Sequence, residues 1–256
     1  MQTVAVFNQK GGSGKTTTVV NLAAALAERG QRVLVFDLDP QGSASAWLGV
    51  RESGRGTLAI FEGEKVSLSD LASHSDVAGV DVVPASPWLL HVERTAAGTK
   101  AEGRLRRAVL ALPETWDWVL VDCPPSLGLL ALSALVACPF VLVPVEAHTM
   151  ALAGLAALQQ TMAHVRAELN PDLELLAVLA CRVDARTNLS RDVVTRLRDW
   201  GGPLVLEAIV RESVRLAEAP SFHQPITQYA PASSGAEDYR AVAAELLART
   251  KRSQRR

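Results

Sequence analysis

The sequence predicts an α/β fold in which helices cover both faces of one mostly parallel, twisted sheet. Its 256 residues are 48% hydrophobic and 21% charged, as is typical of globular proteins. Short runs of Val, Leu and Phe recur without alternation between apolar and polar residues, which indicates strands that are buried on both faces. Helical patterns separate these runs, as the crossovers between parallel strands require. We therefore expect a doubly covered parallel sheet.

The apolar runs and the helical patterns place the individual elements. Strands are predicted at 4–7, 33–36, 80–83, 118–121, 140–143, 175–179 and 204–209. Helices are predicted at 16–29, 104–112, 152–169, 189–200 and 235–249. No internal repeat or low-complexity linker interrupts them. We expect a single domain over residues 1–250, followed by a basic, disordered tail over residues 251–256.

One long stretch of the sequence carries no charged side chain. No charged residue occurs between Asp122 and Glu146, and this length is close to that of a membrane span. However, prolines at 124, 125, 139 and 144 and a glycine at 128 interrupt the stretch. It is better interpreted as a turn, a short helix over 126–137 and a buried strand. We therefore expect no transmembrane helix.

The charge of the chain is unevenly distributed. The formal net charge is -1, yet residues 1–181 carry 13 basic and 18 acidic side chains, whereas residues 182–256 carry 13 basic and 9 acidic ones. A basic last third is compatible with a surface that contacts nucleic-acid phosphates. It is also compatible with an ordinary solvated basic face.

The cysteines and the N-terminal residues indicate the cellular compartment of the protein. Cys123, Cys138 and Cys181 are odd in number and show no C-x-x-C spacing, and no apolar signal segment follows Met1. A reducing cytoplasm is the expected location.

A glycine-rich loop lies between the first predicted strand and the first helix. It reads Q-K-G-G-S-G-K-T-T-T over residues 9–18. In such a loop backbone N–H groups close around phosphate oxygens, Lys15 can reach the β- and γ-phosphates, and the Thr16 hydroxyl can ligate Mg²⁺. The Walker A pattern G-x-x-x-x-G-K-[ST] is altered, because Gln9 occupies the first glycine position and a second lysine, Lys10, stands beside the glycines. The loop predicts a P-loop NTPase of the deviant Walker A type, with ATP and Mg²⁺ as its cofactors.

Two other predicted strands lead into acidic residues. The second strand runs into D-L-D-P-Q-G over 37–42, and the strand W-V-L-V ends in Asp122. Side chains at the carboxyl ends of parallel strands face the ligand crevice. Asp122 after an apolar strand is typical of a Walker B acid, which holds Mg²⁺ through water. Asp37 and Asp39 are also compatible with a simple turn.

In combination these motifs resemble the deviant-Walker ATPases and, more narrowly, the ParA/Soj-type partition ATPases of the ParA/MinD superfamily. The similarity extends from residue 3 to about residue 249 through D-A-R-T-N at 184–188, V-R-L-A-E-A-P-S-F at 214–222, P-I at 225–226, Y-A-P at 229–231 and S-G-A at 234–236. Three segments depart from the family pattern. Ser13 stands where many relatives have Val, residues 210–213 read V-R-E-S in place of P-R-N, and residues 151–154 read A-L-A-G in place of A-L-E-G. The second departure lies where the family lines its base pocket, so the adenine contacts stay unassigned.

The resemblance implies roles for the residues of the loop and of the strand ends. It implies a slow ATP hydrolase whose catalytic residues are Lys10, Lys15 and Asp39, with Lys10 reaching the phosphates bound by the other subunit of an ATP-dependent sandwich homodimer. Asp39 is expected to order the attacking water, and the metal is expected at Thr16 and Asp122 with support from Asp37. The expected nucleotide-binding residues are Lys10, Gly11, Gly12, Ser13, Gly14, Lys15, Thr16 and Thr17, the last near the α-phosphate.

The resemblance also implies partners. Arg186 and Arg215 are expected to bind DNA without sequence preference, which places the protein on the nucleoid within the cytoplasm, and a ParB-type centromere-binding protein is expected to stimulate hydrolysis. An alternative is a MinD-like ATPase that positions a membrane-associated or protein cargo. Because residues 248–256 offer no Leu, Phe or Trp for insertion, we expect no stable membrane association. An iron–sulfur carrier is disfavoured because the cysteine spacing does not match. Chromosome, plasmid and protein cargo all stay open.

Overall fold

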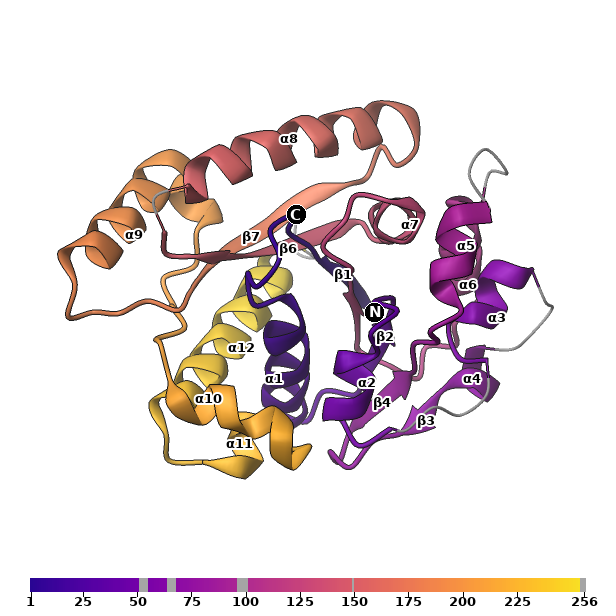
Figure 1. Ribbon diagram of the computed structural model, residues 1–256, viewed down its shortest axis with the longest axis horizontal. Helices are drawn as coiled ribbons and strands as arrows, with labels where there is room; N and C mark the ends of the chain where they lie inside the picture. The colour runs from indigo at the N-terminus through magenta and orange to yellow at the C-terminus, as the bar shows by residue number, and fades with distance from the viewer. Residues whose placement is uncertain (51–54, 64–67, 96–100, 149, 254–256) are drawn as a thin grey trace.

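A single sheet organises the computed structural model, which describes residues 1–50, 55–63, 68–95, 101–148 and 150–253 (Figure 1). Within these residues seven strands pair in the order β3-β4-β2-β5-β1-β6-β7. Every pair is parallel except β3 with β4. The strands are β1 (Gln2–Val6), β2 (Val33–Asp37), β3 (Ser73–His74), β4 (Val80–Val83), β5 (Trp118–Asp122), β6 (Phe140–Glu146) and β7 (Glu174–Cys181). The predicted α/β class with a mostly parallel sheet is confirmed.

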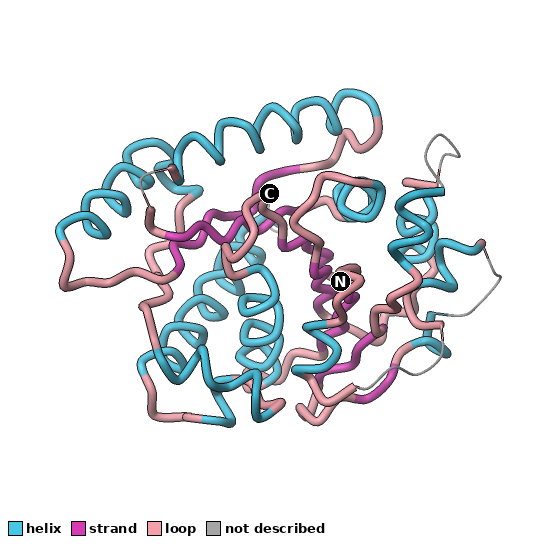
Figure 2. The backbone as a smooth tube through the Cα atoms, in the orientation of Figure 1, coloured by secondary structure: helices cyan, strands magenta, loops and turns pink. Residues whose placement is uncertain are grey.

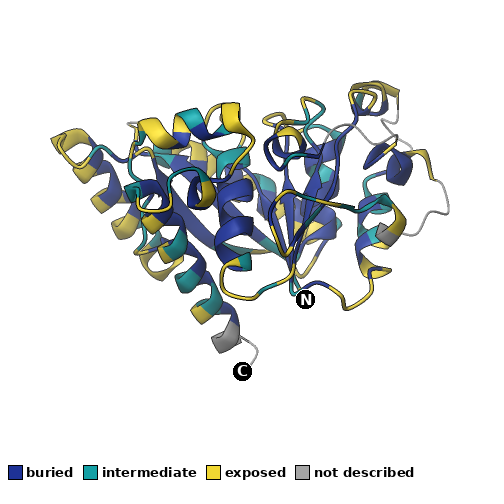
Figure 3. Ribbon diagram, turned by 90° about the horizontal axis from the view of Figure 1, so that it is seen from below, coloured by how far each residue is buried: buried dark blue, intermediate teal, exposed yellow. Residues whose placement is uncertain are grey.

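Helices cover the two faces of this sheet (Figures 2 and 3). One face packs against α1 (Lys15–Ala27), α2 (Ser43–Trp47), α10 (Val214–Glu218), α11 (Ile226–Tyr229) and α12 (Ser234–Ser253). The other packs against α3 (Leu58–Glu62), α5 (Leu89–Thr95), α6 (Gly103–Leu110), α7 (Leu129–Ala137), α8 (Ala151–Glu168) and α9 (Asn188–Gly201). The short helices α4 (Leu68–Leu71), η1 (Gly202–Leu204) and η2 (Ala219–Phe222) complete the described elements.

The two hydrophobic cores explain why the strand sequences do not alternate. Successive strand residues point to opposite faces of a sheet. Accordingly Val35 belongs to the core under α1 and α12, whereas Phe36 belongs to the core under α5 to α9, and both are fully buried. Because each face is covered, both sets of side chains must be apolar.

The uncharged stretch between Asp122 and Glu146 divides as predicted. Its first part is a turn followed by α7, and its second part is the buried strand β6. The helix begins at Leu129, three residues later than predicted, after the extended residue Gly128. In the described part of the chain, no helix has both the length and the apolar character needed to cross a bilayer.

The strand predicted at 204–209 is wrong. This segment forms only one isolated parallel bridge, Val178 with Val205, and a second one, Val183 with Arg211, follows it. The N–H groups of Glu207 and Ala208 instead donate to the carboxylate of Glu245 on α12, at 3.1 and 3.0 Å. A side chain therefore takes the donors that a regular ladder would pair.

Shorter elements were not predicted at all, and one helix is longer than predicted. The edge strand β3 has two residues, and α2, α3 and α4 have four or five each, which is too short for a periodic signal. At the other end, α12 continues to Ser253. Of the predicted disordered tail, residues 254–256 lie outside the described residues.

The register brings the predicted acidic positions together. Asp37 of β2 is the partner of Asp122 of β5, and Asp122 is also the partner of Val6, the last residue of β1. The glycine loop that follows β1 therefore lies at the same sheet edge as both carboxylates. In doubly wound sheets ligands bind at this edge.

Candidate active site

The glycine-rich loop passes directly into α1. The helix begins at Lys15, and its N-cap Gly14 has a left-handed φ of 90°. Gly12 also has a positive φ, 73°, a conformation that side chains other than glycine adopt only with strain. Because the first N–H groups of a helix have no partner within the helix, the loop and the start of α1 can receive an anion.

Lys15 lies inside this loop. Its side chain is only 7% exposed, and Nζ donates to the carbonyl oxygen of Lys10 across the loop at 3.3 Å. Burial lowers the pKa of Lys15, while the neighbouring carboxylates of Asp122 and Asp39 act in the opposite direction. Lys15 is thus held inside its own loop.

Thr16 and Asp122 form the predicted metal end. Thr16 Oγ1 donates to Asp122 Oδ2 at 2.8 Å, and Asp122 is completely buried. Among the described residues three buried side-chain oxygens have no hydrogen-bond partner, and two of them belong to this site, Asp122 Oδ1 and Ser13 Oγ. Burial raises the pKa of Asp122 well above its usual range, and the charge of Asp37 adds to the rise. An oxygen-rich, unsatisfied carboxylate site of this kind fits Mg²⁺.

Asp37 and Asp39 are placed differently. Asp37 is fully buried, and its oxygens accept from Ser45 N at 2.8 Å, Ser45 Oγ at 2.7 Å and Asp39 N at 3.1 Å. Burial raises its pKa to about 6 despite these hydrogen bonds. Asp39 is half-buried and accepts from Gln41 N at 3.0 Å. In this geometry Asp37 organises the turn that carries Asp39. The expected support of the metal by Asp37 and the expected ordering of water by Asp39 stay predictions.

Lys10, in contrast with Lys15, is directed outward. Its side chain is 48% exposed, and Nζ lies 2.7 Å from Glu146 Oε2. Arg182 contacts the other oxygen of Glu146 at 3.3 Å. Glu146 ends β6, and the hydrogen bond from Lys10 lowers its pKa. The two lysines of one loop therefore have opposite environments, one enclosed and one accessible.

A cleft of about 1010 Å³ begins at the phosphate loop. Gly12, Gly14 and Thr17 form its inner end. Its walls come from residues 181–186 at the end of β7, from residues 210–217 without Arg215, and from the start of α12. A cleft of this size beside a phosphate loop can hold a nucleoside. It includes residues 210–213, the segment that departs from the family pattern.

The two arginines expected to contact DNA lie on segments that border this cleft. Arg186 pairs with Asp184 through Nε and Nη2 at 2.9 and 3.1 Å, and Arg215 on α10 pairs with Glu218 at 3.0 Å. Their side chains are 88% and 62% exposed. The Asp184 carboxylate raises the pKa of Arg186, and Tyr229, followed by Glu218, raises the pKa of Arg215.

Several polar residues of this region were not predicted. Glu146 follows the same rule of strand ends as Asp37 and Asp122, so its position carried a usable signal. Ser45 and Asp238 carried no such signal. Ser45 binds Asp37 across a turn of the chain, and Asp238 binds Arg211, which is 27 residues away in the sequence. The three cysteines are buried and unpaired, and among the described residues no cluster of His, Cys, Asp and Glu could bind a metal by itself.

The sequence matches one protein family and is similar to several named proteins. Residues 1–175 match the AAA domain family. The chain is 47% identical to the chromosome-partitioning ATPase Soj of Thermus thermophilus, over 96% of this chain and 95% of that protein. It is 41% identical to the chromosome partitioning protein ParA of Myxococcus xanthus, over 99% of this chain and 90% of that one.

Solved structures agree with this similarity. The cobyrinic acid a,c-diamide synthase of Mycobacterium smegmatis with bound ADP and magnesium superposes with a TM-score of 0.83 at 35% identity, covering 98% of this chain and 96% of that chain. The septum site-determining protein MinD of Pyrococcus horikoshii, complexed with Mg-ADP, has a TM-score of 0.78 at 24% identity, covering 96% and 95%. The second likeness shows the fold alone.

Proposed function

The chain belongs to the ParA/Soj-type partition ATPases of the ParA/MinD superfamily, and on this premise we propose that it is an ATP-dependent DNA segregation ATPase. In this proposal the ATP-bound homodimer binds DNA without sequence preference and is released when a partner stimulates hydrolysis. One observation carries the proposal: a single loop holds one lysine enclosed at the phosphate site and a second lysine exposed beside it.

The enclosed part of the site binds and positions the triphosphate. Backbone N–H groups of the loop and the start of α1 receive the phosphate oxygens, and Lys15 neutralises charge between the β- and γ-phosphates. Thr16 and Asp122 would hold Mg²⁺, and Thr17 would contact the α-phosphate. When bound, Mg²⁺ neutralises the charge that develops on the transferred phosphoryl group. Asp39 orients the attacking water from the turn held by Asp37.

The exposed lysine couples ATP to dimerisation. Lys10 is directed away from the enclosed site, and its ammonium contacts Glu146 at the end of β6. An accessible cation beside a bound polyanion can serve a second subunit, whose triphosphate attracts it across the interface. Lys10 of each subunit thus completes the phosphate site of the other, and the dimer forms only with ATP.

DNA binding uses Arg186 and Arg215, which are duplicated in the dimer. Their ion pairs with Asp184 and Glu218 lie at the surface, where such pairs contribute little to stability. DNA phosphates can therefore replace these carboxylates. The basic excess of residues 182–256 supports the same surface. The stimulating partner is a ParB-type centromere-binding protein, and the protein is located on the nucleoid within the cytoplasm.

The Lys10→Ala variant tests the proposal. It is expected to bind Mg²⁺ and ATP as a monomer, because Lys15, Thr16 and Asp122 are intact, but to lose ATP-dependent dimerisation in size-exclusion chromatography. The wild-type protein with ATP and with ADP provides the reference. A Lys10→Ala protein that dimerises with ATP as the wild type does would contradict the proposed role of this lysine.

A further inference from the structure

The segment 210–213 forms one wall of the cleft beside the phosphate loop. It runs along the end of β7 without joining the sheet as a strand. Val210 N donates to Ala180 O at 2.8 Å, Val183 N donates to Val210 O at 3.1 Å, and Glu212 N donates to Val183 O at 3.1 Å. These bonds fix one side of the segment. They do not fix its other side, which faces the start of α12.

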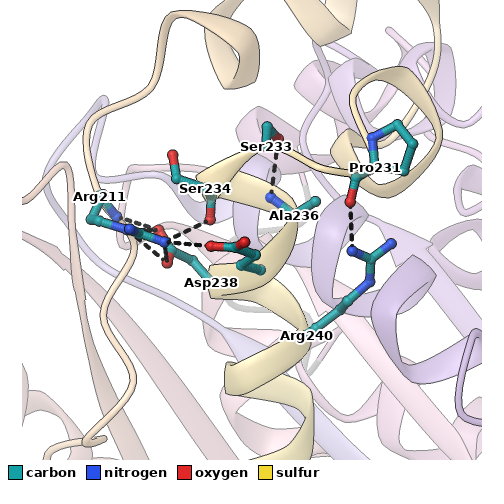
Figure 4. A network of polar contacts seen from close by, with 8 residues as sticks. Arg211, Pro231, Ser233, Ser234, Ala236, Asp238 and Arg240 are labelled. Atoms are coloured by element: carbon teal, nitrogen blue, oxygen red, sulfur yellow. Dashed lines mark hydrogen bonds and ion pairs between the residues drawn. The ribbon is translucent and has the colours of Figure 1, made fainter.

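Arg211 provides the second attachment (Figure 4). Its backbone N–H donates to Asp238 Oδ2 at 2.9 Å, and its guanidinium donates to Asp238 Oδ1 from Nη2 at 2.6 Å and from Nε at 2.9 Å. Nη2 also donates to Ser234 O and Glu237 Oε2, both at 3.2 Å. Asp238 is buried. A buried carboxylate engaged by both the backbone and a bidentate guanidinium fixes geometry more strongly than a surface ion pair does.

The helix that supplies Asp238 also reaches the phosphate loop. Tyr239, the next residue of α12, is buried and lines the cleft. Its hydroxyl lies 3.4 Å from Thr18 Oγ1 on α1, one residue after Thr17. The start of α12 therefore contacts the wall of the cleft through Asp238 and the helix of the phosphate loop through Tyr239.

We propose that Arg211 and Asp238 are positioning residues that set the wall of the nucleoside subsite and thereby its affinity for adenosine. This inference rests on the proposed ATP function of the neighbouring loop. It also gives a physical role to the segment V-R-E-S, which the family pattern leaves unexplained. Arg211 lines the cleft on a segment separate from the glycine loop, and Asp238 holds it there. Loss of the pair therefore weakens binding of the nucleoside and leaves the phosphate contacts in place.

The test compares ATP with inorganic tripolyphosphate, each with Mg²⁺, by isothermal titration calorimetry. Arg211→Lys and Asp238→Asn each remove the bidentate pair. Both are expected to weaken ATP binding by about tenfold or more, the effect of losing a hydrogen bond to a charged group. Tripolyphosphate, which has no nucleoside, is expected to keep its affinity within about twofold. Glu237→Gln is the matched control, since Glu237 makes only a peripheral contact to Arg211, and it should bind both ligands as the wild type does.

Three outcomes would overturn the inference. Unchanged ATP affinity in the variants, or equal weakening for ATP and tripolyphosphate, would remove the role at the nucleoside subsite. Failure of both variants to fold, judged by thermal unfolding, would assign the pair to folding instead. Failure of the proposed function is distinguishable, because the wild-type protein would then bind neither ligand.

Discussion

The two ends of the nucleotide site are built in different ways. The phosphate end consists of one continuous segment, residues 10–17, together with carboxylates at the ends of adjacent strands. The proposed nucleoside end is assembled from three segments, residues 181–186, residues 210–217 without Arg215, and the start of α12. The first depends on local backbone geometry, whereas the second depends on tertiary contacts such as Arg211 with Asp238.

Lys15→Ala is the strongest way to test this difference. Removing the enclosed ammonium should reduce ATP hydrolysis by on the order of a hundredfold or more, as loss of a preorganised charge-stabilising group does. It should weaken binding of ATP and of tripolyphosphate alike, whereas the variants of Arg211 and Asp238 affect ATP alone. Phosphate release and calorimetry measure the two effects. Undiminished hydrolysis in Lys15→Ala would show that the chemistry occurs elsewhere.

The sequence predicts the residues of the phosphate end better than those of the proposed nucleoside end. The glycine loop, Asp37 and Asp122 could be predicted, because a contiguous motif and the ends of apolar strands are visible along the chain. Glu146 obeys the same rule of strand ends and could have been found. Asp238 could not have been found, since its partner Arg211 is 27 residues away. An acidic residue in the first turns of a helix does not by itself indicate a cleft.

The predicted strand at 204–209 failed for a related reason. Its apolar pattern is typical of a strand, yet Glu245 of α12 captures the N–H groups of Glu207 and Ala208. Tertiary contacts override local preference here. This error arises from a contact between segments that are distant in the sequence, and the contact of Arg211 with Asp238 is of the same kind.

Arg215→Glu tests the surface outside the cleft, and a smaller effect is expected. Reversing this charge should weaken ATP-dependent DNA binding by about tenfold on every DNA sequence and reduce its salt dependence, because phosphate contacts release counterions. ATP affinity should not change, since Arg215 itself does not line the cleft. Fluorescence anisotropy with two unrelated duplexes at several salt concentrations measures the effect.

A matched control for Arg215→Glu is available in the N-terminal part of the chain. Arg32 is similarly exposed and pairs with Asp117, so Arg32→Glu makes the same change in net charge away from the basic third. It should leave DNA binding nearly unchanged. Equal weakening by both variants would mean that net charge alone, and not a surface near the cleft, governs DNA affinity.

Glu146→Gln should give the smallest effect, and it addresses the exposed lysine. Lys10 must leave Glu146 to reach a second subunit, so the ion pair at 2.7 Å competes with dimerisation. The lowered pKa of Glu146 keeps it ionised at neutral pH. Gln keeps the size and a hydrogen-bond acceptor but removes the charge. The ATP concentration at the midpoint of dimerisation should fall by about threefold, the scale of one surface ion pair, and less at high salt.

Light scattering during an ATP titration measures this shift in the dimerisation midpoint. Glu207→Gln serves as the control, because Glu207 is also an exposed acid in an ion pair, with Arg198, and lies away from Lys10. If Glu146→Gln needs as much ATP as the wild type, or more, Glu146 does not compete for Lys10. If Glu146→Gln needs less ATP than the wild type and Glu207→Gln does not, the contact with Glu146 restrains Lys10 in the monomer. One loop then combines a fixed phosphate ligand, Lys15, with a releasable one, Lys10.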